Sequence, residues 1–282
     1  MIRSLEQHDD APCIHLAGRV ATYGEIRRRT SQLVQAQRSR GVKSGTRVAV
    51  LSKNRPEVLT NLTASLVNGC VLTPLHPMGS LTDHAYVIGD AEIDCLVFDA
   101  DNFAERAREL LEQYPRLTVL GFGPNDVGDD YLALADEFEP TSLTAPDVRP
   151  DELCTIVYTG GTTGRPKGVL MSHRVWAAMT WIQMAEWELP DVLRMAIATP
   201  LSHAAMSLVA PVLLSGGAFY VMESFSPDGF FDLVEEHRIT ATLLVPVMLY
   251  ALQGHDRYAT ADMSTMETIF YGASPMSPAK LR

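Results

Sequence analysis

Residues Thr159–Gly168 read Thr-Gly-Gly-Thr-Thr-Gly-Arg-Pro-Lys-Gly, and this decapeptide is the most informative stretch of the chain. The run before it, Leu153–Tyr158, is rich in β-branched and aromatic residues and predicts a buried strand. Glycines let backbone N–H groups approach phosphate oxygens because no Cβ stands in the way. The threonine hydroxyls add hydrogen-bond donors, and Lys167 adds a positive charge. The pattern therefore favours a polyphosphate-binding loop over an ordinary surface loop.

The loop does not have the spacing of a Walker A motif. That motif places Gly before its Lys and Ser or Thr after it, whereas Pro166 and Gly168 flank Lys167 here. The residues that follow, 168–172, predict a second strand and not the helix that a Walker loop opens. We therefore expect a hairpin-like phosphate loop, and a P-loop kinase or GTPase becomes the disfavoured alternative.

The decapeptide and its flanking strands resemble the phosphate-loop signature of the AMP-forming acyl-adenylating enzymes. This superfamily includes acyl-CoA synthetases, peptide-synthetase adenylation domains and beetle luciferases. One departure is Gly160, where family members usually carry serine. Further stretches resemble family segments in the same order along the chain: 21–26, 200–206, 245–250 and 271–277. The resemblance covers nearly the whole chain, but only the N-terminal half of a family member.

The resemblance implies an AMP-forming acid–CoA ligase. Such an enzyme uses ATP, Mg²⁺ and coenzyme A to activate a carboxylic acid as an acyl-adenylate and then to form a thioester. The family's Tyr-Gly-x-Thr-Glu motif and its C-terminal domain with a catalytic lysine do not follow, and Pro275 cannot supply the acidic motif's carboxylate. We therefore expect weak or no activity from this chain alone and assign no metal ligand in it. The alternative is a non-catalytic nucleotide- or acyl-binding remnant, or an interaction protein.

Two residues are implied in catalysis. Lys167 would neutralise charge on the β- and γ-phosphates as pyrophosphate leaves, and its alternative is a surface lysine. His203 follows the predicted strand 193–199, and ligands gather at the carboxyl ends of strands in open α/β sheets. By resemblance His203 would border the reacting carboxylate. Its alternative is a histidine that caps the next helix through a local hydrogen bond.

The other expected contacts fall into two groups. The resemblance implies nucleotide contacts from the phosphate loop and from a later Gly-Ala loop: Thr159, Gly160, Gly161, Thr162, Thr163, Gly164, Lys167, Gly272, Ala273 and Ser274. It implies substrate contacts from His203, Met248, Tyr250, Tyr271 and Gly272. An ordinary core position for Met248 and a simple turn at Gly272 remain open alternatives.

The substrate class is narrowed by a missing carboxylate. Amino-acid adenylating domains typically carry an aspartate at the start of the pocket, but residues 201–206 contain no acidic side chain. A buried, unpaired ammonium group is costly, so amino acids are disfavoured. Fatty, alicyclic and aryl carboxylic acids remain, and the choice between coenzyme A and a carrier-protein thiol stays open.

Composition excludes several other classes. The 282 residues are 46% hydrophobic, enough for a full core, and the net charge of −11 argues against a nucleic-acid partner. Four cysteines without a Cys-x-x-Cys pair indicate neither a zinc site nor a disulfide framework. Pro211 and Gly216 interrupt the longest apolar stretch, 208–222, below membrane-spanning length. We expect a cytoplasmic protein without a membrane span.

Strand and helix patterns alternate along the chain, which predicts an α/β fold of layered, mostly parallel sheets flanked by helices. A Pro-rich, acidic connector at 139–152 suggests two α/β subdomains, 1–140 and 153–282, that together form a partial AMP-binding domain. A surface left by missing C-terminal segments would expose apolar residues, so we expect aggregation or an artificial dimer through that face. The strands expected in the second unit are 153–158, 168–172, 193–199, 218–222, 241–245 and 267–271, with helices at 173–188, 204–214, 227–237 and 247–253.

Overall fold

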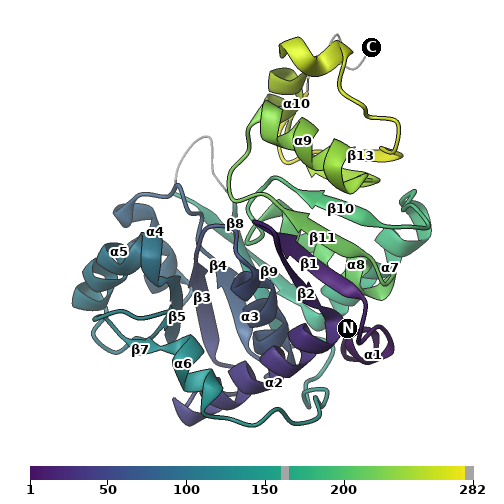
Figure 1. Cartoon of the computed structure of the whole chain (residues 1–282). Helices are drawn as coiled ribbons and strands as arrows, with labels where there is room; N and C mark the ends of the chain where they lie inside the picture. The colour runs from purple at the N-terminus through teal and green to yellow at the C-terminus, as the bar shows by residue number, and fades with distance from the viewer. Residues whose placement is uncertain (160–164, 277–282) are drawn as a thin grey trace.

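Two sheets flanked by helices make up the fold (Figure 1). The computed structural model describes residues 1–159 and 165–276. One sheet has seven strands in the order β7-β6-β5-β3-β4-β8-β9, and the other has six in the order β13-β12-β10-β11-β1-β2. Antiparallel pairing occurs between β1 and β2 and between β8 and β9, while the remaining pairs are parallel. The expected layered, mostly parallel α/β class is confirmed.

The seven-stranded sheet is built mainly from the first half of the chain. Its strands are β3 (Arg47–Leu51), β4 (Val71–Pro74), β5 (Cys95–Asp99), β6 (Thr118–Phe122), β7 (Asp129–Asp130), β8 (Leu153–Thr159) and β9 (Lys167–Ser172). The helices of this half are α2 (Tyr23–Ser39), α3 (Pro56–Val67), α4 (Leu81–Asp90), α5 (Ala100–Gln113) and α6 (Tyr131–Asp136). A capping box of Thr22 and Glu25 opens α2, with both of its reciprocal hydrogen bonds formed.

The six-stranded sheet collects the second half and the N-terminus. Its strands are β1 (Pro12–Leu16), β2 (Arg19–Thr22), β10 (Arg194–Ile197), β11 (Ala218–Val221), β12 (Ala241–Leu244) and β13 (Thr268–Tyr271). Around it lie α1 (Ile2–Gln7), α7 (His173–Glu186), α8 (Val209–Leu214), α9 (Pro227–His237), α10 (Pro246–Gln253), and the 3₁₀ turns η1 (Ala204–Leu208) and η2 (Asp256–Ala259).

The two sheets exchange strands from opposite halves of the chain. The N-terminal hairpin β1–β2 joins the second sheet, where β1 pairs in parallel with β11. Conversely, β8 and β9 extend the first sheet, because β8 pairs with β4. The sheets therefore do not divide at the connector 139–152, and the assignment of two subdomains, 1–140 and 153–282, stays a prediction.

One expected helix differs from the structure. The stretch 204–214 begins as the 3₁₀ turn η1 and becomes α-helical only from Val209. Pro211 explains the break, since it has no N–H with which to continue an α-helical ladder from the preceding turn. Proline is tolerated in the first turn of a helix, which is where α8 places it.

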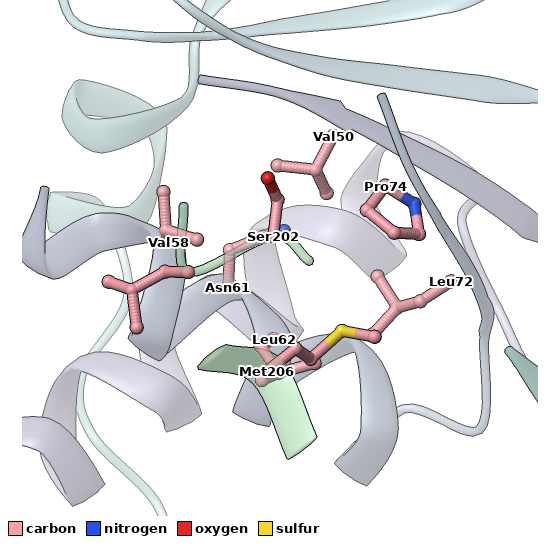
Figure 2. Close-up of a pocket in the computed structure, with 9 residues that line it drawn as sticks. Val50, Val58, Asn61, Leu62, Leu72, Pro74, Ser202 and Met206 are labelled. Atoms are coloured by element: carbon pink, nitrogen blue, oxygen red, sulfur yellow. The ribbon is translucent and has the colours of Figure 1, made fainter. Parts of the chain in front are cut away.

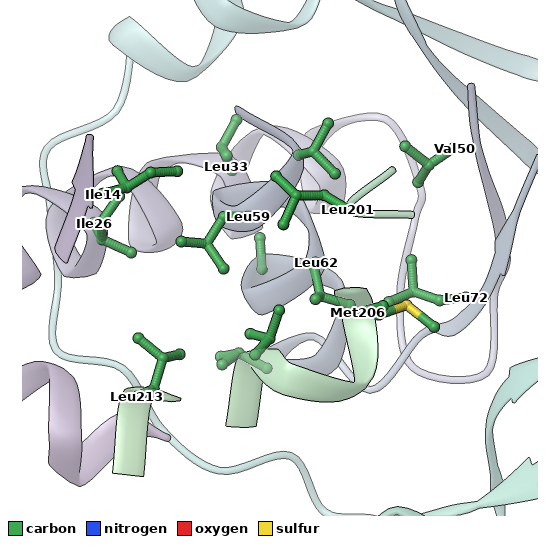
Figure 3. Close-up of a cluster of buried hydrophobic side chains, with 14 of the residues drawn as sticks. Ile14, Ile26, Leu33, Val50, Leu59, Leu62, Leu72, Leu201, Met206 and Leu213 are labelled. Carbon is green, nitrogen blue, oxygen red and sulfur yellow. The ribbon is translucent and has the colours of Figure 1, made fainter. Parts of the chain in front are cut away.

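The largest buried cluster lies between the sheets and joins both (Figure 3). It brings together Ile14 of β1, Leu59 and Leu62 of α3, Leu72 of β4, and Met206 of η1. Helix α3 thus packs against the segment that follows β10, and this contact fixes the ends of the two sheets relative to each other. No helix in the described ranges has the length and apolar character needed to cross a bilayer.

Candidate active site

The phosphate loop closes a β-hairpin, as expected. Strands β8 and β9 pair antiparallel, with Thr159 opposite Lys167 at the end where the loop connects them. The Thr159 hydroxyl donates to the Lys167 carbonyl oxygen at 3.5 Å, and both side chains are exposed. The remaining expected loop contacts lie outside the described residues: Gly160, Gly161, Thr162, Thr163 and Gly164.

The base of this hairpin is fixed to helix α4. The Tyr158 hydroxyl donates to the Asp90 carboxylate, and the Arg165 guanidinium lies 5.6 Å from the centroid of the Tyr86 ring. Gly168 allows close packing here, because a Cβ at this position would lie 3.1 Å from Cζ of Tyr158. Lys167 therefore lies on a hairpin that is held against α4 by these contacts.

His203 lies in the loop after β10, at the carboxyl end of that strand. Its Nδ1 is 3.0 Å from Oγ of Ser202, and its backbone N–H donates to the Pro200 carbonyl at 3.0 Å. The residue precedes η1 but makes no side-chain capping hydrogen bond. The helix-capping interpretation of His203 is therefore wrong for this helix, and its half-buried imidazole is left to contact other groups.

The principal contact of His203 is His76, which the sequence patterns did not indicate. The two imidazole rings meet edge to face with centroids 4.6 Å apart. His76 follows β4, so this contact joins the carboxyl ends of strands from the two different sheets. Neither sequence distance nor a motif signals the pair, because the two residues are brought together only by tertiary packing.

A buried histidine holds the His76 loop in place. His84 of α4 is 2% exposed, and its Nε2 lies 2.8 Å from the His76 carbonyl oxygen. Arg106 approaches the other nitrogen, Nδ1, at 2.9 Å and donates to the Gly79 carbonyl. Because an arginine can only donate, Nδ1 accepts and Nε2–H donates to His76. Burial lowers the pKa of His84, which agrees with this neutral form.

The carboxyl ends of both sheets thus meet at one place. Strand β4 leads to His76 and is the neighbour of β8, which leads into the phosphate hairpin. Strand β10 leads to His203 in the other sheet. Ligands in open α/β folds bind at such edges. The fold therefore places an imidazole pair and a glycine-threonine hairpin at the ends of adjacent strands.

Asn54 bridges the two sheets at this edge. It follows β3, and its Nδ2 donates to the carbonyl oxygens of Thr199 at 3.1 Å and Met222 at 3.0 Å. Its Oδ1 accepts from the Leu201 N–H at 2.8 Å. The side chain therefore pairs three backbone groups beside the loop that carries His203.

Asn54→Ala is expected to lower the free energy of unfolding by about 2 kcal/mol, because three hydrogen bonds of a part-buried side chain are lost. The Leu201 amide should also exchange with solvent faster. Urea denaturation and hydrogen exchange measure the two effects. Asn54→Asp is the matched variant, since it keeps the acceptor for Leu201 but loses both donors; equal Leu201 exchange in the two variants would contradict this role.

The imidazole of His203 is expected to stay neutral well below pH 7. Burial, and secondarily the charge of His76, lowers the pKa of His203 to about 4. An unfolded chain would take up this proton near pH 6.5, so the unfolded state binds more protons between pH 6.5 and 4. The contribution of His203 to stability is therefore full above pH 6.5 and declines as the pH falls towards 4.

NMR titration of the histidine side chains would measure this pKa directly. His76→Asn should raise the pKa of His203 towards its ordinary value, because it removes the second cause. A His203 resonance that titrates near pH 6.5 in the folded wild-type chain would show that the imidazole is exposed and unperturbed.

The Gly-Ala loop at Gly272 and Ala273 lies at the same edge of the six-stranded sheet. Tyr271 ends β13, which is separated from β10 by β12. Gly272 has open space where a Cβ would stand, and Ala273 adopts a left-handed φ of 64°. Ser274 is exposed. These residues are at the correct strand ends for a ligand, and their contacts with nucleotide stay a prediction.

The expected acyl contacts Met248 and Tyr250 lie on α10, the helix that follows β12. Met248 packs against the buried cluster of Phe230, Val234 and Leu252, beneath α9. Tyr250 is half-buried on the same helix. The surroundings of Met248 favour the core interpretation, whereas a substrate role for Met248 and Tyr250 stays a prediction.

In 1–159 and 165–276 no three side chains of His, Cys, Asp or Glu are grouped so that they could hold a metal ion. Magnesium prefers oxygen ligands and is often held by substrate phosphates with one or two carboxylates. No chemical step is therefore assigned to a protein-bound metal here.

A family model described as AMP-binding enzyme matches residues 2–282. The chain belongs to this family. The chain is 43% identical over its whole length to a medium/long-chain-fatty-acid–CoA ligase, FadD8, of Mycobacterium tuberculosis, and covers 50% of that protein. It is 32% identical over 99% of its length to a feruloyl-CoA synthase of an Amycolatopsis species, covering 54% of it.

Solved structures agree with the fold of this chain. The amide bond synthetase McbA of Marinactinospora thermotolerans superposes with a TM-score of 0.87 at 28% identity, over 99% of this chain and 56% of that one. The chain thus spans about half the length of the curated relatives it matches. The resemblance to the acyl-adenylating enzymes is confirmed at the level of family and fold.

Proposed function

We propose that this chain contributes the phosphate-binding and acid-binding parts of an AMP-forming acid–CoA ligase. The carrying observation is the meeting of strand ends: the hairpin of Lys167 adjoins β4, which leads to His76, and the His76 ring contacts His203, which follows β10 of the other sheet. Acid–CoA ligation by the relatives supports the reaction class. ATP and coenzyme A are the proposed co-substrates.

The proposed first step forms an acyl-adenylate. A carboxylate oxygen of the acid attacks the α-phosphorus of ATP, the bond to the β-phosphate oxygen breaks, and pyrophosphate leaves with its electron pair. Lys167 would stabilise the charge that develops on pyrophosphate. His203, kept neutral by burial, would accept or donate one hydrogen bond beside the carboxylate without adding a charge.

The proposed second step transfers the acyl group to a thiol. The sulfur of coenzyme A attacks the acyl carbonyl carbon, and AMP leaves with the bonding electrons of the mixed anhydride. Fatty, alicyclic and aryl acids are the proposed substrates, and a fatty acid is favoured by the 43% identical relative. A reducing cytoplasm is the proposed setting, consistent with four free, buried cysteines.

Nucleotide binding by residues 1–282 tests the proposal. Isothermal titration with ATP and AMP is expected to show binding, and acid-dependent ATP–pyrophosphate exchange is expected to be weak in this chain alone. Octanoate, dodecanoate, cyclohexanecarboxylate, benzoate and phenylalanine form the acid panel. A chain that is folded by circular dichroism but binds neither nucleotide would overturn the proposal, while binding without any exchange over long incubation would favour a non-catalytic binding protein.

A further inference from the structure

Two cavities beside the His203 loop share two lining residues. The first is small, about 20 Å³, and is lined mainly by apolar side chains of β3, α3 and β4 together with Asn61 and Ser202 (Figure 2). The second measures about 570 Å³ and lies among α3, α7 and α8. Leu62 and Met206 line both cavities. These two side chains are therefore the partition between them.

The small cavity adjoins Ser202, the residue that contacts His203. Ser202 lines it and also places its Oγ 3.0 Å from Nδ1 of His203. Asn61 adds a fully buried amide whose Nδ2 has no partner within the described chain. A volume of about 20 Å³ holds roughly one water molecule, and no acyl chain of several carbons fits until the partition moves.

Met206 is the partition residue that can move. Its unbranched side chain has three rotatable bonds, and methionine adapts readily to different packing. In Figures 2 and 3 it extends beside Leu72 and Leu62. Leu62, in contrast, sits in the middle of α3, where the helix limits its rotamers. Rotation of Met206 alone would join the two cavities.

The large cavity is mostly apolar and suits the hydrocarbon tail of a fatty acid. Its volume falls within the range of small-molecule pockets. Among the described residues that line it, the ionisable groups are the amino group of Met1, the imidazole of His173 and the thiol of Cys154. Burial raises the pKa of that thiol to about 12, so it stays uncharged. The lining includes Leu66, Val148, Trp176, Thr180, Val209 and Leu214.

We propose that Met206 is a gate that admits the tail of a long, unbranched fatty acid from the His203 side into the cavity among α3, α7 and α8. This inference rests on the proposed function, since it places the carboxylate beside His203. It makes Met206 the residue that sets chain-length specificity. Each methylene that enters the apolar cavity is expected to tighten binding by up to about four-fold.

The experiment measures the affinity of residues 1–282 for butanoate, octanoate, dodecanoate and hexadecanoate by displacement of a fluorescent fatty acid. Met206→Trp is expected to weaken dodecanoate binding at least ten-fold and to leave butanoate within two-fold. Ala177→Trp should also weaken dodecanoate binding, because the indole would fill the large cavity. Ala177 is exposed on α7, so this substitution does not require the buried core to repack. Met206→Ala should retain dodecanoate binding.

Met78→Trp is the matched control, because Met78 is 86% exposed and lines neither cavity. Unchanged dodecanoate affinity in both Met206→Trp and Ala177→Trp would overturn the gate, as would an equal loss for every chain length. A chain that binds ATP but shows no length-dependent acid binding would remove the gate and leave the proposed function intact. Length-dependent binding that responds to Met206, without ATP binding, would support the gate and remove the ligase proposal.

Discussion

Lys167→Ala is expected to weaken ATP binding by roughly 10- to 100-fold, the range that loss of a charged hydrogen bond predicts. Lys167 is exposed at the loop end of the β8–β9 hairpin, directly opposite Thr159. An ammonium group there can approach the β- and γ-phosphates without loss of a structural contact. AMP lacks those phosphates, so its affinity should fall much less than that of ATP. Isothermal titration of both nucleotides measures the difference.

Lys43→Ala is the matched control for this prediction. Lys43 is also exposed, but it precedes β3 and so lies at the amino ends of the parallel strands. Its loss is expected to change ATP affinity by less than two-fold. Equal effects of Lys43→Ala and Lys167→Ala would mean that Lys167 acts only through the general charge of the chain.

Arg55→Met is expected to lower the free energy of unfolding by about 3 kcal/mol, at the low end of the range for breaking a buried ion pair. The Arg55 guanidinium lies 2.8 Å from Oδ1 of Asp99, whose side chain is 2% exposed. Asp99 also accepts hydrogen bonds from the Asp101 N–H and the Asn102 amide. These remaining bonds moderate the loss but leave a buried negative charge without its cation. Urea denaturation measures the change.

Two further variants test the cause of that loss. Asp99→Asn in the Arg55→Met background should recover part of the stability, because it removes the charge and keeps an acceptor oxygen. Arg149→Met breaks a pair with Glu152 in which the arginine side chain is 84% exposed, so its expected cost is under about 0.5 kcal/mol. A loss in Arg55→Met no greater than that of Arg149→Met would show that the Asp99 pair contributes little.

The local patterns of the sequence predicted much of the fold. The hairpin around the phosphate loop and the strands expected at 218–222 and 241–245 each depend on neighbouring residues, and the structure contains all three. Strands β1 and β4 were not predicted. β1 and β4 are only five and four residues long, too short for a clear periodic signal.

The candidate site was predicted less completely than the fold. Lys167 and His203 stand in motifs, so local sequence was enough to select them. His76 was missed because its contact with His203 depends on two sheets whose ends meet, and no spacing along the chain encodes that meeting. The same reason explains Asn54, whose partners Thr199 and Met222 lie 145 and 168 positions away.

The exchange of strands between the sheets has a consequence for synthesis on the ribosome. The hydroxyl of Tyr23, just after β2, donates to the Gly217 carbonyl 194 positions later, at the start of β11. At about 5–20 residues per second, roughly 10 to 40 s pass between the translation of these two partners. During that interval the N-terminal hairpin has emerged without the strand it pairs with. A chaperone that binds exposed strand edges would have its longest opportunity at β1 and β2, and a pause in translation before β11 would lengthen it.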